Sequence, residues 1–344
     1  MMPRLVFVHG IGGARDTDQE LHTWAAALAK GMRLAGHSEA AAAVEDGKVD
    51  SVFASYADLF ARPQQQGTDL SHQLTADEAR LLSDVMLEVI DGRLAVVGES
   101  VTSDASGYGM SDDALRVLMY ARAQAQPAGQ AQGTGSLVRQ AVNVATTLLA
   151  LPAVRRASGW AVPKLMVRDL AQVARYLARS EAQGVAGTWE GAGEAARTLD
   201  QRIRDRVLAA LREGPAVVVA HSLGTVVALE ALHHHAGAVP LMVTLGSPIS
   251  MRTVVWPRLV PQPPCVPDGV GRWLNFWDRD DIIAARPVLE ADVLPNAVGV
   301  RPTSARVDSD GIWVHSAVKY LGQPAVAGPI AEALGLRHRD ASPA

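Results

Sequence analysis

The chain has 344 residues, of which 48% are hydrophobic and 20% are charged, and its net charge is −4. This composition is typical of a soluble globular protein, and it lacks the concentrated basic face of a nucleic-acid-binding protein. The length suits one large α/β domain that carries an insertion. Cys265 is the single cysteine, so no disulfide can form within the chain, and we expect a cytoplasmic protein.

The first predicted element is a strand over Leu5 to Val8, an unbroken apolar run that suits a parallel strand covered on both faces. It is too short to cross a membrane, and we expect no secretory leader ahead of it. A helix is predicted next, because apolar residues recur at helical spacing from Leu21 to Leu28. Thr17 and Glu20 have the spacing of a capping box at its start, and a second strand is predicted over Val49 to Ala54.

Residues 59–194 differ in character, because they are rich in alanine, glutamine, serine and glycine and contain no predicted strand. We therefore expect residues 1–58 and 195–340 to form an α/β core, residues 59–194 to form a mostly helical insertion that acts as a lid, and residues 341–344 to be a disordered tail. Within the insertion, helices are predicted over Glu78–Ile90, Asp112–Ala121, Leu137–Leu151 and Val167–Arg179, with a flexible linker over Gln124–Ser136.

The most apolar part of the insertion is the stretch from Val142 to Leu151. Ordinary packing of a helix against the core explains such a stretch. The alternative is an element that faces the substrate or makes transient contact with a membrane surface, where Arg155 and Arg156 would suit anionic headgroups. It is too short for a transmembrane helix.

Alternation of helix and strand resumes near Leu199. Such alternation implies a mostly parallel sheet with right-handed crossovers, and functional groups collect beyond the carboxyl ends of its strands. The predicted elements are a helix over Leu199–Leu211, a strand over Ala216–Ala220, a helix over Gly224–Leu232 and strands over Leu241–Leu245 and Arg272–Trp277.

A sharp turn is predicted at Ala220-His221-Ser222-Leu223-Gly224, between an apolar strand and a helix. The reversal crowds the residues two before and two after the serine, and Ala220 and Gly224 are small enough for it. The turn raises the Ser222 hydroxyl out of the sheet and leaves the N–H of Leu223 at a helix N-terminus, where negative charge is stabilised. The alternative is that Ser222 only caps the helix.

A glycine-rich segment, His9-Gly10-Ile11-Gly12-Gly13, follows the first predicted strand. Its glycines let the backbone approach a substrate closely. The segment is not a phosphate-binding loop, because no Gly-Lys-Ser/Thr follows it. A plain strand-to-helix turn is the alternative interpretation.

These segments resemble the lipase- and esterase-like members of the α/β-hydrolase superfamily, including uncharacterised bacterial members with a helical insertion. The turn around Ser222 resembles their nucleophile elbow, with Ala220 in place of the usual first glycine. A strand that ends in Leu-Gly-Ser-Pro, here residues 245–248, also recurs among them, and we interpret Ser247 as structural. The resemblance covers residues 5–56 and 199–320.

The resemblance implies a mostly parallel central sheet of the α/β-hydrolase type, with the large helical insertion as a lid or cap. It also implies that Ser222 is a nucleophile and that the N–H groups of Ile11 and Leu223 form an oxyanion hole. The residues that support these two turns are His9, Gly10, Gly12, His221 and Gly224.

The base is sought after Ser222, because the family has its triad in the order serine, acid, histidine. The three histidines at 233–235 point in different directions at a helix end, and they suit the helix C-terminus better than a catalytic or metal site. His338 lies in a polar tail. His315, just before a helical stretch, is therefore the predicted base.

The acid is expected among the three aspartates that follow the strand ending at Trp277. By resemblance to the lipase-type pattern, Asp281, followed by two isoleucines and with Pro287 beyond, fits best. Asp280 is the second choice and Asp278 the third.

These motifs together predict a serine hydrolase that cleaves a carboxylic ester with an apolar acyl group through an acyl-enzyme. A thioester, amide or peptide substrate would use the same triad, and a non-catalytic binding protein that retains the fold is the other class considered. We expect no cofactor and no metal, a small-molecule or lipid ester as partner, and no nucleic acid.

Overall fold

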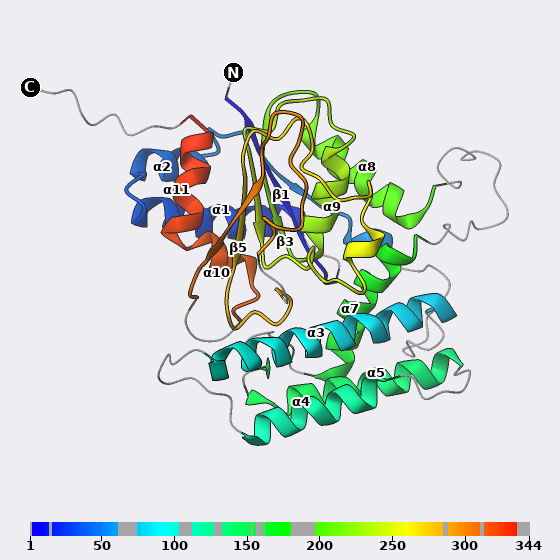
Figure 1. Cartoon of the computed structure of the whole chain (residues 1–344). Helices are drawn as coiled ribbons and strands as arrows, with labels where there is room; N and C mark the ends of the chain where they lie inside the picture. Colours follow the sequence, from blue (N-terminus) through cyan, green and yellow to red (C-terminus); the bar gives the residue numbers. More distant parts are fainter. Residues whose placement is uncertain are drawn as a thin grey trace, which may run out of the picture.

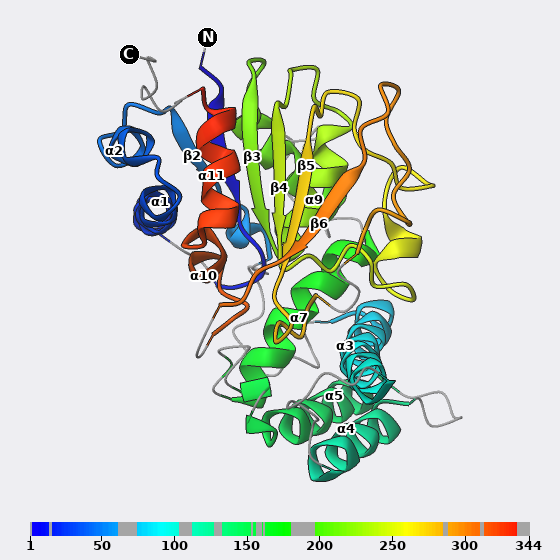
Figure 2. The ribbon, with the colours of Figure 1, turned by 60° about the vertical axis from the view of Figure 1, so that its left-hand side comes forward.

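Six parallel strands form one sheet in the order β2-β1-β3-β4-β5-β6 (Figures 1 and 2). The chain adds β2 on one side of β1 and then crosses to add β3 on the other side. The boundary between β1 and β3 is therefore the topological switch point, where open α/β sheets bind their ligands. The strands are β1 (Arg4–Val8), β2 (Ser51–Ala54), β3 (Ala216–His221), β4 (Leu241–Leu245), β5 (Trp273–Trp277) and β6 (Pro302–Arg306).

The fold is known here from a computed structural model. It describes residues 2–13, 16–60, 74–102, 112–126, 133–152, 154–155, 160, 162–179, 197–284, 288–309 and 313–335. The predicted α/β class is confirmed by the parallel sheet and its helices. Arg156, Pro287, His338, residues 127–132 of the predicted linker and the predicted tail lie outside the described residues.

Helices cover both faces of the sheet. Side chains alternate along each buried strand, so each strand presents apolar residues to both layers of helices. Leu5 and Phe7 face one layer, whereas Val6 and Val8 face the other. The first layer contains α1 (Thr17–Leu34), α2 (Ser38–Glu45), α10 (Ala317–Leu321) and α11 (Pro324–Ala333), and the second contains α8 (Leu199–Leu211) and α9 (Leu223–Leu232). Figure 2 shows the first layer on one side of the sheet and α9 on the other.

Between β2 and α8 the chain forms a group of helices without a described strand. Their place is beyond the carboxyl ends of the strands, on the side opposite the N-terminus (Figures 1 and 2). Their buried residues belong to the same continuous hydrophobic cluster as the second layer of the core. The helices are α3 (Ala76–Thr102), α4 (Asp112–Ala125), α5 (Thr134–Leu149) and α7 (Pro163–Ala178). We call this group the helical insertion.

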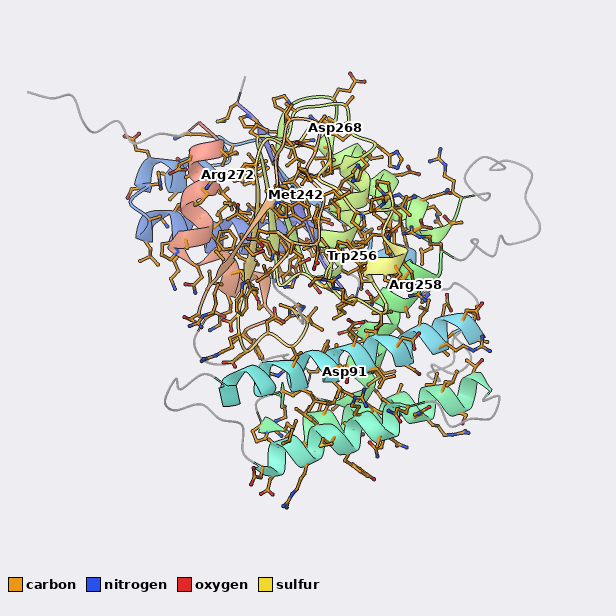
Figure 3. The ribbon with its side chains drawn as sticks, viewed as in Figure 1. Asp91, Met242, Trp256, Arg258, Asp268 and Arg272 are labelled. Atoms are coloured by element: carbon orange, nitrogen blue, oxygen red, sulfur yellow. The ribbon has the colours of Figure 1, made fainter. Side chains whose placement is uncertain are left out.

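The side-chain view orients the two ends of the molecule (Figure 3). Asp268 and Arg272 lie near the amino ends of the strands, and Asp91 lies on α3 in the insertion. Trp256 and Arg258, which form a short 3₁₀ helix over Trp256–Arg258, lie where the core meets the insertion. The carboxyl ends of the strands therefore point toward the insertion.

Several predicted boundaries are wrong. Asp16, rather than the predicted capping box, caps α1, since its carboxylate accepts from the N–H groups of Asp18 and Gln19. The predicted linker is helical at both ends, because α4 continues to Ala125 and α5 already begins at Thr134.

The edge strand β6 and the helices α2 and α11 were not predicted. β6 has a single buried residue, Pro302, so the sequence carries no apolar run to mark it. In the apolar stretch of the insertion, α5 buries Val144, Ala145, Leu148 and Leu149 in the continuous cluster. Ordinary packing therefore accounts for these four side chains. Within the described part of the chain, no helix combines the length and the apolar character needed to cross a bilayer.

Candidate active site

Ser222 lies at the turn between β3 and α9 in a backbone conformation that is rare for residues other than glycine, with φ 54° and ψ −131°. Such a conformation costs on the order of 1–3 kcal/mol and persists where the surrounding structure imposes it. The Ser222 N–H donates to the carbonyl oxygen of Leu245 at the end of β4, at 3.0 Å, and α9 begins at Leu223. The turn thus holds the serine at the carboxyl edge of the sheet.

Close packing explains the small residues around this turn. A Cβ atom added to Gly224 would lie 2.2 Å from the carbonyl oxygen of His9. A Cβ atom added to Gly10 would lie 2.6 Å from the Cβ of Ser222. The loop after β1 therefore lies directly against the turn after β3, at the switch point of the sheet.

His315 comes close to Ser222 from the segment that precedes α10. Its Nε2 lies 3.0 Å from the Oγ of Ser222, and the residue is buried. His221, the neighbour of the serine, donates from its Nε2 to the carbonyl oxygen of His315 at 2.7 Å. The two imidazole rings lie 4.7 Å apart between centroids. The turn that carries the serine therefore also holds the backbone of the histidine.

Asp281 lies on the other side of the imidazole, with its Oδ2 2.8 Å from the Nδ1 of His315. Its Oδ1 accepts from the N–H of Ile283 at 2.9 Å. Burial by itself would raise the pKa of Asp281, but the electrostatic interaction with His315 and hydrogen bonds from His315, Tyr320 and the Ile283 N–H hold this pKa below its ordinary value. The carboxylate is therefore an acceptor, so Nδ1 of His315 carries the proton and Nε2 accepts from the Ser222 hydroxyl.

The other two aspartates of this loop have different surroundings. Asp278 is buried, and its carboxylate accepts from the N–H of Asp280 at 2.8 Å and from the N–H and hydroxyl of Ser309 at 2.6 and 2.7 Å. Asp280 is exposed. Neither carboxylate has a hydrogen bond to His315 among the described contacts, so Asp281 is the aspartate that the structure joins to the histidine.

Gly246 was not predicted as a site residue. It follows β4 directly, with φ 54°, and a Cβ atom there would lie 2.5 Å from Oδ2 of Asp281 and 3.1 Å from Nδ1 of His315. Only glycine combines this conformation with this closeness. The signal in the sequence was its place after an apolar strand, next to Ser247.

The segment after β1 is anchored by the side chain of His9. The Nε2 of His9 accepts from the N–H of Tyr56 at 3.3 Å, so Nδ1 carries the proton and donates to the carbonyl oxygen of Gly10 at 2.6 Å. His9 is buried and stacks on Tyr56, with ring centroids 4.1 Å apart. In a trans peptide the C=O and N–H point in opposite directions, so the N–H of Ile11 points away from His9.

Gln172 on α7 holds the same segment from the insertion, a contact that was not predicted. Its Oε1 accepts from the N–H of Gly12 at 3.0 Å, and its Nε2 donates to the carbonyl oxygen of Gly12 at 2.9 Å. A glutamine inside an amphipathic helix carries no signal for such a contact, because its partner lies 160 residues away.

The remaining candidates have structural partners. Ser247 shares a hydrogen bond with Thr225 at 2.8 Å, and its hydroxyl also accepts from the N–H of Ile249. His233 bonds the carbonyl oxygen of Cys265 at 3.2 Å, and burial lowers its pKa. These contacts agree with the structural interpretation of both residues.

A cavity of about 380 Å³ opens beside Ser222 and His315. Its walls come from five parts of the chain: the segment after β1, α1, the insertion, the turn that carries Ser222 and the segment from His315 into α10. Among its lining residues are Ile11, Glu20 and Trp160. The indole Nε1 of Trp160 donates to Asp169 on α7 at 3.1 Å. The insertion therefore forms part of the wall next to the serine.

Among the residues that the structure describes, no group of three or more histidine, cysteine, aspartate or glutamate side chains is arranged to hold a metal ion. Comparison of the chain with family models, curated proteins and solved structures finds no match. The chemistry of this site is therefore inferred from its own geometry.

Proposed function

We propose that this protein is a serine hydrolase that cleaves a carboxylic ester by a Ser222-His315-Asp281 triad. The observation that carries the proposal is the continuous chain of two hydrogen bonds, 3.0 Å from Ser222 Oγ to His315 Nε2 and 2.8 Å from His315 Nδ1 to Asp281 Oδ2. A serine hydroxyl needs a base to accept its proton, and an imidazole held in the right tautomer by a carboxylate is such a base.

In the first step, the Oγ of Ser222 attacks the ester carbonyl carbon while its proton passes to Nε2 of His315. The imidazolium is stabilised by the buried Asp281 carboxylate, whose pKa is held below its ordinary value. The tetrahedral intermediate then collapses, and His315 returns the proton to the leaving alcohol. The product of this half-reaction is an acyl ester on Ser222.

The negative oxygen of the intermediate requires hydrogen-bond donors that are already in place. We assign this role to the N–H groups of Ile11 and Leu223. Leu223 is the first residue of α9, so its N–H lacks a partner within the helix and lies at the positive end of the helix dipole. The His9 side chain bonds the Gly10 carbonyl, which belongs to the same peptide group as the Ile11 N–H. Because the two groups of a trans peptide point in opposite directions, this bond sets the direction of the Ile11 N–H.

Water completes the reaction by hydrolysing the acyl ester on Ser222. His315 accepts a proton from a water molecule that attacks the acyl carbon, and the second intermediate collapses with return of the proton to Ser222. A carboxylic acid leaves, and the enzyme regains its starting state.

We also infer that the chain is a lipase- or esterase-like member of the α/β-hydrolase superfamily. The six-stranded parallel sheet supports this, together with the order serine, aspartate, histidine and the places of Ser222 directly after β3 and of Asp281 in the loop after β5. The cavity of about 380 Å³ is near the lower limit for small-molecule sites, which favours a short acyl group over a long one.

The test is a chain-length series of p-nitrophenyl esters and matched thioesters and amides with the wild type, Ser222→Ala and Ser247→Ala. We expect turnover that is highest for short esters, loss of it in Ser222→Ala and retention in Ser247→Ala. A fluorophosphonate should label Ser222, identified by the mass of the modified peptide. No turnover across the panel together with an unlabelled Ser222 would contradict the proposal and favour a binding protein.

A further inference from the structure

The segment after β1, residues 9–13, which we call the oxyanion segment, is rich in glycine, so its own conformational preferences do not define its shape. Gly12 has φ 144°, outside the range that other residues readily adopt. Three consecutive peptide groups of this segment nevertheless have a side-chain partner each. The carbonyl of Gly10 bonds to His9, and the N–H and carbonyl of Gly12, which belong to the next two peptides, both bond to Gln172.

The two anchors lie on either side of the proposed oxyanion donor. His9 acts on the peptide that contains the Ile11 N–H, and Gln172 acts on the two peptides that follow it. His9 comes from the end of β1, whereas Gln172 comes from α7 in the insertion. Both side chains are buried, so these hydrogen bonds are shielded from water.

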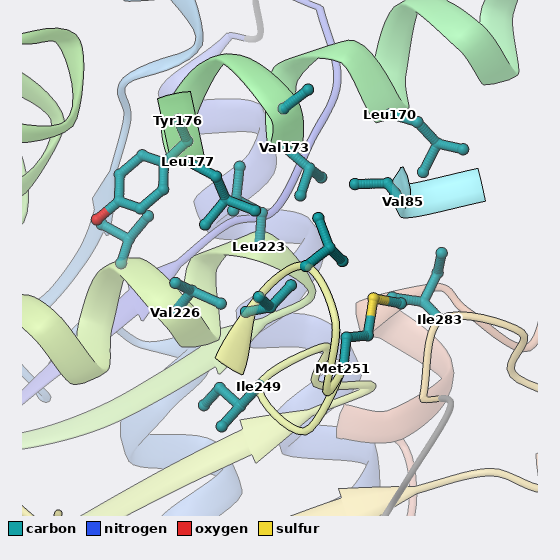
Figure 4. Packing of buried hydrophobic residues seen from close by; sticks show 14 of the residues in the cluster. Val85, Leu170, Val173, Tyr176, Leu177, Leu223, Val226, Ile249, Met251 and Ile283 are labelled. Carbon is teal, nitrogen blue, oxygen red and sulfur yellow. The ribbon is translucent and has the colours of Figure 1, made fainter. Parts of the chain in front are cut away.

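The helix that carries Gln172 is itself firmly packed. Val173 and Leu177 on α7 lie over Leu223 and Val226 on α9, as Figure 4 shows. Because α9 starts at the nucleophile turn, this packing sets α7 at a defined distance from Ser222. Leu170, on the same helix, is buried in the same cluster.

The C-terminal end of α7 is held by buried charges. Arg179, the residue after the helix, bonds Asp200 on α8 and Glu230 on α9, each at 2.6 Å. Tyr176 donates to Glu230 at 2.7 Å. The helix is thus joined to the core by apolar packing along its length and by ion pairs at its end.

We propose that Gln172 is a positioning residue that holds the Ile11 N–H in the oxyanion hole, so that the helical insertion is a fixed part of the catalytic site. The inference rests on the proposed function, since it assigns a role in the same reaction. In this arrangement the insertion covers the site without swinging open, because a lid that moved would take the anchor of the oxyanion segment with it.

The effect on rate follows from the demands of the oxyanion. Donors must lie within about 2.7–3.1 Å of the developing negative charge, and loss of one donor lowers the rate by about 100- to 1,000-fold. Removal of Gln172 displaces a donor without deleting it, so the expected loss of kcat is about 10- to 100-fold. The KM should change by less than about 3-fold, because the ground-state carbonyl is bound weakly by these donors.

The experiment compares Gln172→Met, which keeps the length of the side chain without its amide, with Gln140→Met. Gln140 is the matched control, because its amide also bonds backbone carbonyls inside the insertion, those of Gln124 and Gln126, but does not touch the site. We measure kcat and KM on a short ester and the inhibition constant of a trifluoromethyl ketone, whose adduct on Ser222 places a negative oxygen in the hole.

For Gln172→Met we expect the inhibition constant to rise by the same factor by which kcat/KM falls, and for Gln140→Met we expect neither to change. A folded Gln172→Met protein with the kcat and ketone inhibition of the wild type overturns the inference, while the proposed function stands. A loss confined to KM or to thermal stability also overturns it. Absence of turnover in the wild type overturns the proposed function and the inference with it.

Gln172→Glu is the second test of the proposal, for use if Gln172→Met does not fold. It keeps the acceptor for the Gly12 N–H but turns a carboxylate oxygen toward the Gly12 carbonyl oxygen. We expect the same parallel loss of kcat and ketone affinity. Unchanged values in a folded Gln172→Glu protein contradict the proposal as directly as they do for Gln172→Met.

Discussion

The hydroxyl of Tyr320 donates a hydrogen bond of 2.7 Å to Oδ2 of Asp281, the same oxygen that accepts from Nδ1 of His315. Tyr320 lies in α10, which begins two residues after His315, so one short stretch of chain supplies both partners of this oxygen. The tyrosine oxygen also accepts from the N–H of Asp278 at 3.0 Å. Burial and the charge of Asp281 raise the pKa of Tyr320 well above its ordinary value, which keeps the hydroxyl protonated as a donor.

We predict that Tyr320→Phe lowers both stability and kcat. The lost bond to a charged acceptor is worth about 1.5–3 kcal/mol, and the N–H of Asp278 loses its acceptor. Tyr176→Phe is the matched control, because Tyr176 is also buried and donates to a carboxylate, that of Glu230, at 2.7 Å. We expect Tyr176→Phe to lower the free energy of unfolding and to leave kcat unchanged. Equal loss of kcat in both variants would contradict a specific role of Tyr320.

The pH dependence of the Tyr320→Phe effect has a defined sign. A carboxyl group with a lowered folded pKa stabilises the native state above its unfolded pKa, about 3.9 for aspartate, and this contribution disappears as the pH falls through the folded pKa. Loss of the Tyr320 bond raises the folded pKa of Asp281. Urea unfolding should therefore show a larger difference between wild type and variant at pH 7 than at pH 3. An equal or larger difference at pH 3 would exclude this explanation.

Substitution of the three aspartates separates their roles. Asp281→Asn should lower kcat by about four orders of magnitude, because the amide removes the charge and favours the wrong tautomer of His315. Asp280→Asn should leave kcat unchanged, since Asp280 is exposed. Asp278→Asn should mainly destabilise the protein, because it disturbs the bonds to Ser309. Steady-state kinetics on a short ester and thermal unfolding of all three variants provide the measurement, and a larger kcat loss in Asp280→Asn than in Asp281→Asn would refute the assignment.

Gly10→Ala tests the contact between the two turns. The new Cβ would lie 2.6 Å from the Cβ of Ser222 and 3.1 Å from its Oγ, so the backbone of one turn must move. A shift near 1 Å at a reacting group lowers the rate by about 100-fold, and overpacking costs about 1–3 kcal/mol. Gly13→Ala is the control, because no atom lies within 4 Å of its added Cβ. Wild-type kcat in Gly10→Ala would show that the two turns are not packed as described.

Glu230→Gln tests the attachment of α7 to the core. The Glu230 carboxylate bonds Tyr176, Arg179 and Arg204, and its substitution leaves both guanidinium groups partly uncompensated. Breaking a buried ion pair costs about 3–5 kcal/mol. Asp91→Asn removes an exposed pair with Arg122 within the insertion, and it should not change stability measurably. Urea unfolding compares the two, and a similar small effect for both would show that the buried ion pairs do not anchor the insertion.

Local patterns in the sequence predicted strands and helices whose formation depends on residues that are close together in the chain. Apolar runs marked β1, β3, β4 and β5, and helical periodicity marked α7 and α8. A sharp strand-to-helix turn was predicted at Ser222, and its backbone conformation agrees. The edge strand β6 escaped prediction because its side chains are mostly outside the core.

Tertiary structure alone decided which polar groups meet. The sequence presented Asp278, Asp280 and Asp281 within four residues, and only the folded loop directs Asp281 to His315 while Asp278 turns to Ser309. Gln172 and Gly12 lie 160 residues apart, and no local preference of either residue encodes their contact. Strand and turn formation depend on neighbours in the chain, whereas a hydrogen bond between distant residues depends on how the sheet order and the helix packing bring them together.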